Sequence, residues 1–223
     1  AEALGHRIVP AFPGLVGLRT ANLDATLAGL VLPESEVLFK KKGAPAVTGR
    51  GELLLTHTGV SGPAVLDLSA TLAQALDGTA EIPLSIRWIQ TMDRSAWLDR
   101  LAEWRARRGT ATLAALLRDH IPARLARWLC GTAGVPEDIT AAALPAAGRD
   151  ALADALAAFP ARVTATEGWD KAMVTRGGVD VRDADPRTLE SRLVKNLFFA
   201  GETLDVDGPC GGYNLHWAFA SGA

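Results

Sequence analysis

A block with helical pattern, residues 93–160, stands between two stretches with strand pattern, and this order constrains the fold more than any other feature. Before the block, from Arg7 to about Ile89, short β-branched or alternating segments are separated by Gly, Pro and Asn, which is typical of a small antiparallel sheet or barrel. After it, strand pattern returns with RVTAT and continues to NLFFAGE. A helical block between two β-rich blocks predicts an insertion domain.

The helical interpretation of the block rests on the spacing of its apolar residues. Trp97, Leu101 and Trp104 recur at helical spacing. Another helix is expected inside the first β-rich block, where Pro63 suits a first helical turn and Ser61 precedes it as a capping residue. We expect the tryptophans of the helical block in its core rather than on a stacking platform, because aromatic side chains dominate protein cores.

Composition narrows the class of protein. At 223 residues and 48% hydrophobic, the chain is long enough for one or two compact cores. With 23 basic and 25 acidic residues, the overall charge gives no reason to expect a nucleic acid or membrane partner, and no apolar run reaches membrane-spanning length. Cys130 and Cys210 lack metal-ligand spacing, which argues against a zinc site or a disulfide framework and fits a reducing cytoplasm.

Charge is uneven along the chain. Between Arg94 and Gly131, eight arginines stand against three acidic residues. A solvated helical face accounts for most runs of this kind. The alternative is a surface that attracts anions, and the pattern leaves both interpretations open.

The segment LFFAGETLDVDGPCGGYNLHWAFASG, residues 197–222, carries the candidate chemistry. Its apolar start predicts a strand buried on both faces that ends at Gly201 and Glu202, the place where ligands bind in open α/β sheets. A glycine there lets a bound group approach the backbone, and a carboxylate accepts hydrogen bonds from hydroxyl groups. Behind Gly211 and Gly212, a helix start offers amides to an electron-rich oxygen. The pattern predicts a cradle for a polyhydroxylated, anionic cofactor; a plain glycine turn is the alternative.

Two segments of the sequence resemble one protein family. The C-terminal segment resembles the C-terminal signature of the BaiN-like, aminoacetone-oxidase-family NAD(P)/FAD-dependent flavoproteins of bacteria. The segment GELLLTHTGVSGPAVLDLS, residues 51–69, resembles the signature of the middle domain in the same family. Their order and spacing extend the resemblance over nearly the whole chain.

The resemblance implies an α+β protein in three parts. Residues 1–92 and 161–195 would form a β-rich, barrel-like domain on the substrate side, and residues 93–160 an inserted helical domain. Residues 196–223 would supply the C-terminal strand and helix of an FAD-binding Rossmann-like domain. The order of strand and helical patterns agrees with this division.

The resemblance also implies contacts with FAD. The residues before the glycine loop would approach the ribityl and pyrophosphate region, and the loop and the helix start would pass along the flavin. Amides at a helix start stabilise the negative charge around N1 and O2 of a reduced flavin. No catalytic residue and no metal ligand is assigned. The residues implied as cofactor-binding are Gly201, Glu202, Asp205, Gly211, Gly212, Tyr213, Asn214 and Leu215.

The chain departs from the family at its beginning. Family members start with a strand and a GxGxxG turn that seats the FAD pyrophosphate, and this fingerprint is absent from the 223 residues. The sequence also starts without methionine, which predicts a segment of a longer protein. We therefore expect FAD in the full-length protein, and weak or no FAD binding by this segment alone.

The predicted function is part of an FAD-dependent oxidoreductase that transfers a hydride between a small organic substrate and flavin, with NADH or NADPH as a candidate partner. A first alternative is a non-catalytic interaction module whose arginine-rich helices contact an anionic partner. A second alternative is a segment that needs another chain to complete the flavin site. Pairing or self-association would then occur along Leu197–Ala200, because an uncovered sheet edge seeks partners.

Three further side chains are candidates for the site. His57 and Thr58 follow a predicted strand, where they either face substrate or hold a turn. Cys210 next to the diglycine would be a thiol close to the flavin. The lack of a second cysteine nearby disfavours a redox role for it.

Overall fold

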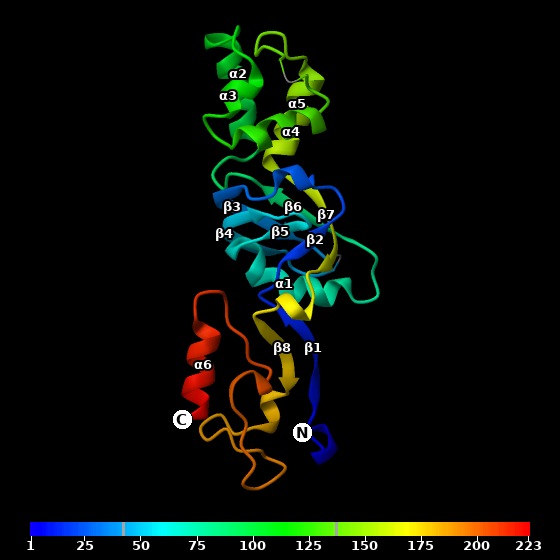
Figure 1. The fold of residues 1–223 in the computed structure, drawn as a ribbon, viewed down its shortest axis with the longest axis vertical. Helices are drawn as coiled ribbons and strands as arrows, with labels where there is room; N and C mark the ends of the chain where they lie inside the picture. Colours follow the sequence, from blue (N-terminus) through cyan, green and yellow to red (C-terminus); the bar gives the residue numbers. More distant parts are fainter. Residues whose placement is uncertain (42, 137) are drawn as a thin grey trace.

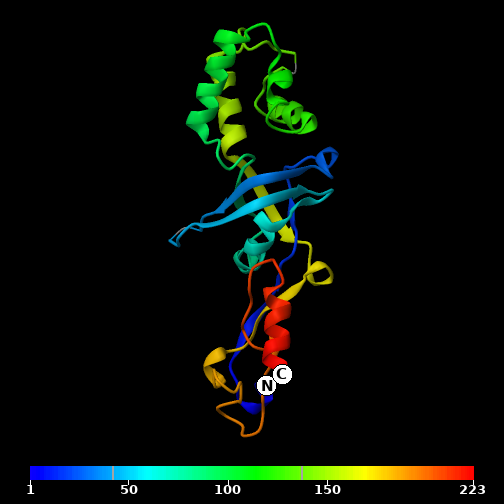
Figure 2. The ribbon, with the colours of Figure 1, turned by 90° about the vertical axis from the view of Figure 1, so that its left-hand side faces the viewer.

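The computed structural model describes residues 1–41, 43–136 and 138–223. The molecule is elongated and has three parts along its long axis (Figure 1). The helices α2 to α5 form one end, a barrel lies in the middle, and the strands β1 and β8 with helix α6 form the other end. Both termini lie at the end away from α2 to α5, as a second view also shows (Figure 2).

The middle part is a closed antiparallel barrel. Its strands follow the order β2, β5, β4, β3, β6 and β7, and β7 closes the barrel by pairing with β2. Side chains of β6 and β7 alternate between buried and more exposed positions, as a barrel wall requires. The predicted α+β fold with a barrel-like domain is confirmed. The barrel strands are β2 (Leu18–Thr20), β3 (Val31–Phe39), β4 (Val47–Leu55), β5 (Gly59–Ser61), β6 (Ile82–Arg87) and β7 (Phe159–Thr166).

Helix α1 (Pro63–Leu76) packs against β4 and β1. Pro63 occupies its first turn as predicted, but the capping residue is Gly62 and not Ser61. Gly62 takes the cap position because its φ of +92° lies in the left-handed region, which favours glycine.

The helical block lies between β6 and β7. Its helices are α2 (Arg94–Arg107), α3 (Leu113–Leu117), α4 (Ala123–Thr132) and α5 (Ala146–Ala157), all inside the predicted range 93–160. The main contacts within it join α2 to α5 and α3 to α4. Trp97 and Trp104 are buried, which confirms their predicted place in the core.

Two sets of contacts join the helical block to the barrel. The indole Nε1 of Trp88, just after β6, donates a hydrogen bond of 2.9 Å to the carbonyl of Ala155 on α5. The guanidinium of Arg124 on α4 donates to the carbonyls of Thr26 and Ala28, at 2.7 and 3.1 Å, in the loop before β3. Since the bonds come from different helices, they resist rotation of the block against the barrel.

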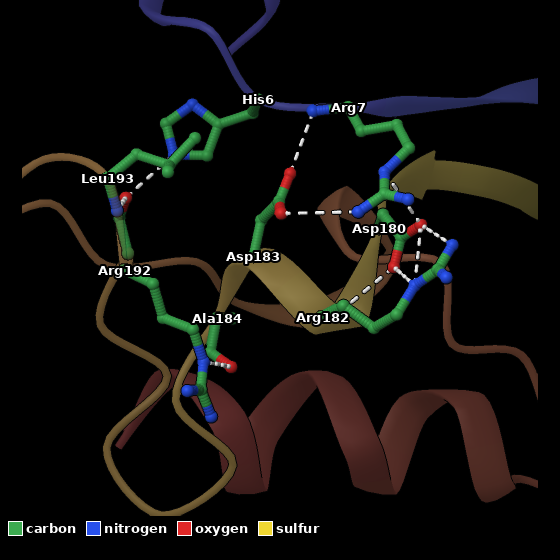
Figure 3. A network of polar contacts seen from close by, with 9 residues as sticks. His6, Arg7, Asp180, Arg182, Asp183, Ala184, Arg192 and Leu193 are labelled. Atoms are coloured by element: carbon green, nitrogen blue, oxygen red, sulfur yellow. Dashed lines mark hydrogen bonds and ion pairs between the residues drawn. The ribbon is translucent and has the colours of Figure 1, made fainter.

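Strands β1 (Ile8–Gly14) and β8 (Val174–Val179) form an antiparallel ribbon beside the barrel. An ionic network holds its far end together (Figure 3). The Asp180 carboxylate lies 2.6 Å from the guanidinium of Arg182 and 3.3 Å from that of Arg7. The hydrogen bonds from Arg182, with the charge of Arg7, hold the pKa of Asp180 far below its usual range.

The chain before β1 is joined to the C-terminal segment by His6. Its imidazole forms a 2.7 Å hydrogen bond with the hydroxyl of Ser191 and meets the ring of Phe199 edge-on. Phe199 belongs to a small separate core with Val179 and Leu204. The start and the end of the chain are therefore packed together.

The strand expected at Leu197–Ala200 differs from the prediction. Within the described ranges it forms one isolated bridge, between Phe198 and Glu190, and then enters a 3₁₀ turn at Gly201–Thr203. A strand requires backbone partners along its length, and the described residues supply them at this bridge alone. The helix expected behind the diglycine is confirmed as α6 (Tyr213–Gly222). In the same described ranges, no helix is long and apolar enough to cross a bilayer.

We expect Gly49→Ala to destabilise the barrel by about 1–3 kcal/mol, the usual cost of overpacking. The added methyl group would overlap the carbonyl oxygen of Ala64, and this atom belongs to the backbone of α1 and cannot rotate away. Urea unfolding measures the change. Gly131→Ala is the control, since its methyl group meets no described atom within 4 Å and alanine favours a helix by up to about 1 kcal/mol. Unchanged stability of Gly49→Ala would contradict the close approach.

We also expect a pH-dependent stability that depends on His120. Its ring lies between those of Trp97 and Trp104, with centroids 5.7 and 5.6 Å away. Burial, assisted by the charge of Arg100, lowers its pKa below the ordinary 6.5. As pH falls below 6.5, the unfolded chain binds a proton that the folded protein resists, so folding becomes less favourable; above 6.5 the effect disappears.

Thermal unfolding at about pH 5.5 and about pH 7.5, on either side of an ordinary histidine pKa, measures this effect. His120→Gln should lose less stability than the unmodified protein between the two conditions. The other three histidines are the same in both proteins, so their contributions cancel in the comparison. Equal losses in the two proteins would show that His120 titrates normally.

Candidate functional site

A hollow of about 540 Å³ opens between β8, the loop before α6 and the first turns of α6. Its walls are mostly apolar, with Leu15 and Val174 on one side and Leu215 and Trp217 on α6. Cys210 also lines it and carries a half-buried thiol. A concave, largely apolar space with a few polar groups is the usual form of a cofactor or ligand site.

The hollow collects most of the residues predicted to bind the cofactor. Those that line it are Glu202, Gly211, Gly212, Asn214 and Leu215. Gly201, Asp205 and Tyr213 lie outside its lining. The proximity of the first group follows from the fold; contact of any of the eight with FAD stays a prediction.

Gly201 holds helix α6 in position. Its carbonyl accepts a 3.0 Å hydrogen bond from the indole of Trp217, and its amide donates a 2.8 Å bond to the hydroxyl of Ser221. A Cβ at this position would lie 3.6 Å from the side chain of Ala218. That distance is an ordinary contact, so the left-handed φ of +58° is what favours glycine at this position.

The carboxylates of Glu202 and Asp205 bind the backbone of β8. Glu202 accepts hydrogen bonds from the amide of Thr175 at 2.9 Å and from its hydroxyl at 3.4 Å. Asp205 accepts a 3.1 Å bond from the amide of Gly177. Both residues attach the C-terminal segment to β8, and this attachment forms one wall of the hollow.

Two side chains, one on α6 and one on α1, hold the loop before α6 through hydrogen bonds to its backbone. The amide group of Asn214 donates to the carbonyl of Gly208 and accepts from its N–H, each at 2.8 Å. The Asp67 carboxylate on α1 accepts a 2.7 Å hydrogen bond from the amide of Cys210. The sequence pattern of α1 marks Asp67 only as an ordinary polar helix position, and its contact with the loop before α6 appears only in the structure.

The start of α6 offers hydrogen-bond donors to the hollow. In the described structure no side chain caps this helix, and the first backbone amides of a helix have no partner inside it. Gly212 has a φ of +91°, and a Cβ placed on it meets no described atom within 4 Å. Apolar walls, open space at Gly212 and donors at one edge fit the ring of a flavin.

His57 and Thr58 lie elsewhere. Both are exposed in the turn between β4 and β5, outside the lining of the hollow. The Thr58 hydroxyl donates to the Glu167 carboxylate at 3.1 Å, and the Thr56 hydroxyl accepts from the amide of Gly59 at 3.0 Å. These bonds hold the turn. Across the described ranges, no group of His, Cys, Asp and Glu is arranged to hold a metal ion.

Comparison with protein families identifies the fold directly. Residues 12–174 match the family described as the HI0933-like protein barrel and H2TH domain. This range includes the whole barrel, α1 and the helical block. The chain belongs to this family, in agreement with the resemblance to the BaiN-like flavoproteins.

Curated relatives match almost the whole chain. A ribosomal RNA dihydrouridine synthase from Escherichia coli is 34% identical over 99% of this chain and 52% of its own length. A 3-dehydro-bile acid delta(4,6)-reductase from Clostridium scindens is 30% identical over 100% of this chain and 54% of its own length. A ribosomal RNA dihydrouridine synthase from Haemophilus influenzae is 28% identical over 99% and 52%. The chain thus spans about half the length of the curated relatives it matches.

We expect Asn214→Asp to open the glycine loop. The variant loses the donor to the carbonyl of Gly208 and places a carboxylate oxygen against it. Alkylation of Cys210, followed by mass spectrometry of this chain, should accelerate about twofold to tenfold, the equivalent of one hydrogen bond of about 0.5–1.5 kcal/mol. Cys130 is buried in both proteins and serves as the internal control. An unchanged alkylation rate of Cys210 would mean that the Asn214 bonds do not hold the loop.

Proposed function

We propose that this chain is part of an FAD-dependent reductase that saturates a carbon–carbon double bond conjugated with a carbonyl group. The observation that carries the proposal is the hollow at the start of α6, where five of the eight residues predicted to bind the cofactor come together. Membership in the HI0933-like family and the relatives' names support it.

The residues of this chain would position the reactants, and bound FAD would supply the hydride. The amides at the start of α6 would donate to the electron-rich edge of the ring. Leu15, Val174 and Leu215 would exclude water from the ring face, and Asn214 would keep the loop closed. NADH or NADPH is the proposed reductant that would reduce the FAD before it reduces the substrate.

The relatives' names agree on the type of bond that changes. Dihydrouridine is uridine with a saturated double bond in its ring, and the delta(4,6) positions of a 3-dehydro steroid are double bonds conjugated with a ketone. Hydride addition at the far end of such a bond moves negative charge onto the carbonyl oxygen. A proton added next to the carbonyl completes the saturation. A hydrogen-bond donor beside that oxygen stabilises this negative charge and so lowers the free-energy barrier to hydride addition.

Uridine in RNA is the substrate that we propose for this chain. Two of the relatives are named for ribosomal RNA, and each aligns with 99% of the chain. The sequence-based expectation of no nucleic acid partner rested on the overall charge of −2. The overall charge of the chain does not report local charge, so we give it less weight than the match of two relatives named for ribosomal RNA to 99% of this chain.

We expect the longer protein to bind FAD and Gly212→Ala to weaken that binding about tenfold. A side chain at a φ of +91° costs about 1–2 kcal/mol, which displaces the backbone at the start of α6. Titration with FAD, followed by visible absorbance, measures the affinity. Gly222→Ala is the control, because a methyl group there meets no described atom within 4 Å and its φ is not left-handed.

The outcomes separate the proposal from the non-catalytic alternative. A longer protein that is colourless and takes up no FAD would contradict the proposal. Equal affinities of the Gly212→Ala and Gly222→Ala variants would place the flavin away from this hollow. Reoxidation of the reduced protein by a ribosomal RNA fragment, in the absence of oxygen, would then test the substrate.

A further inference from the structure

We propose that the helical block binds the phosphate backbone of the RNA substrate through exposed arginines on α2, at the end of α3 and on α4. This inference rests on the proposed function, since it assigns a surface to the RNA. The surface lies at the end of the molecule away from α6 (Figure 1). It would therefore hold a part of the RNA that is remote from the reacting uridine.

The excess of arginine lies in the first part of the block, where residues 94–131 hold eight arginines and three acidic residues. Arg100 and Arg107 share the Glu103 carboxylate, at 3.1 and 3.5 Å. Arg105 and Arg118 are exposed, and no carboxylate among the described residues pairs with either. A guanidinium that is exposed and unpaired is available to phosphate oxygens, which it binds with two donors at once.

The fold brings these charges together from different helices. Arg108, at the end of α2, lies 3.3 Å from Asp119, and Asp119 is next to Arg118 in the sequence. Arg118 and Arg127 line the same open hollow of about 600 Å³, whose acidic lining residue is Asp138. Arg108, Arg118 and Arg127 thus form a band from the ends of α2 and α3 onto α4, and Arg105 precedes Arg108 by three residues at the end of α2.

The surface ion pairs in this band are weak enough for the arginines still to bind phosphate. The Arg108–Asp119 pair is more than half exposed on both sides, and such pairs contribute only about 0–1 kcal/mol. A phosphate can therefore replace the carboxylate at little cost. RNA carries one charge per nucleotide along its backbone, so contacts with several arginines add up and depend strongly on salt.

The junction with the barrel gives the surface a fixed position. Arg124 lies on α4, the helix that also carries Arg127. Its guanidinium donates hydrogen bonds to the carbonyls of Thr26 and Ala28 in front of the barrel strand β3. Trp88 fixes α5 through Ala155. An RNA held by the block would consequently have a defined position relative to the barrel and the α6 hollow.

The direct test measures binding of a fluorescein-labelled ribosomal RNA stem–loop to this chain by fluorescence anisotropy over a range of salt concentrations. The test variant is Arg105→Glu/Arg118→Glu. We expect it to bind at least about tenfold more weakly, and the slope of log affinity against log salt to fall by about two, one unit for each lost phosphate contact.

The control variant is Arg19→Glu/Arg187→Glu. It changes the net charge equally, and both side chains are exposed and without a described side-chain partner. Since all four positions are exposed, both variants should keep the thermal midpoint of the unmodified chain. The control measures the general effect of the charge change on RNA affinity. We expect it to bind RNA within about twofold of the unmodified chain.

Three outcomes would overturn the inference: no RNA binding by the unmodified chain, unchanged binding by the Arg105/Arg118 variant, or an equal loss in the control. Each is independent of the flavin titration. A longer protein that binds FAD while these arginines prove irrelevant would leave the proposed function standing. RNA binding through these arginines without any flavin uptake would instead defeat the proposed function.

Discussion

The return of β7 to the barrel is the constraint on which the rest of the structure depends. β7 begins directly after α5, pairs with β6 on one side and β2 on the other, and then leads toward β8. One strand therefore closes the barrel, ends the helical insertion and directs the chain to the ribbon. If Ala161 and Val163 did not fill the barrel from this strand, neither the helical block nor the α6 hollow would have a fixed base.

The hollow is formed by hydrogen bonds between segments that are far apart in the sequence. Glu202 reaches back to Thr175, and Asp67 reaches forward to Cys210. In each case a carboxylate accepts from a backbone amide, a bond that orders the chain without requiring a matching side chain. A cofactor ring that enters the hollow meets a surface that is already arranged, which reduces the entropy lost on binding.

The sequence predicted the layout better than the role of single side chains. Strand alternation and the helical spacing of Trp97 and Trp104 depend on local geometry, so they indicated the barrel and the inserted helices. The strand expected at Leu197–Ala200 does not form in the structure. An apolar run in the sequence does not show whether a neighbouring strand is present to pair with it. The bonds of Asp67 and Glu202 could not be predicted, since their partners are set by packing over more than 25 residues of sequence.

The long axis separates two tasks that a reductase acting on RNA would have to combine. The α6 hollow, where we propose the flavin chemistry, is lined mostly by apolar side chains, whereas the proposed phosphate-binding surface carries exposed arginines. The barrel lies between them (Figure 1), and the contacts of Trp88 and Arg124 hold the helical block against the barrel. Under the proposal that the substrate is RNA, one extended molecule would contact both surfaces at once.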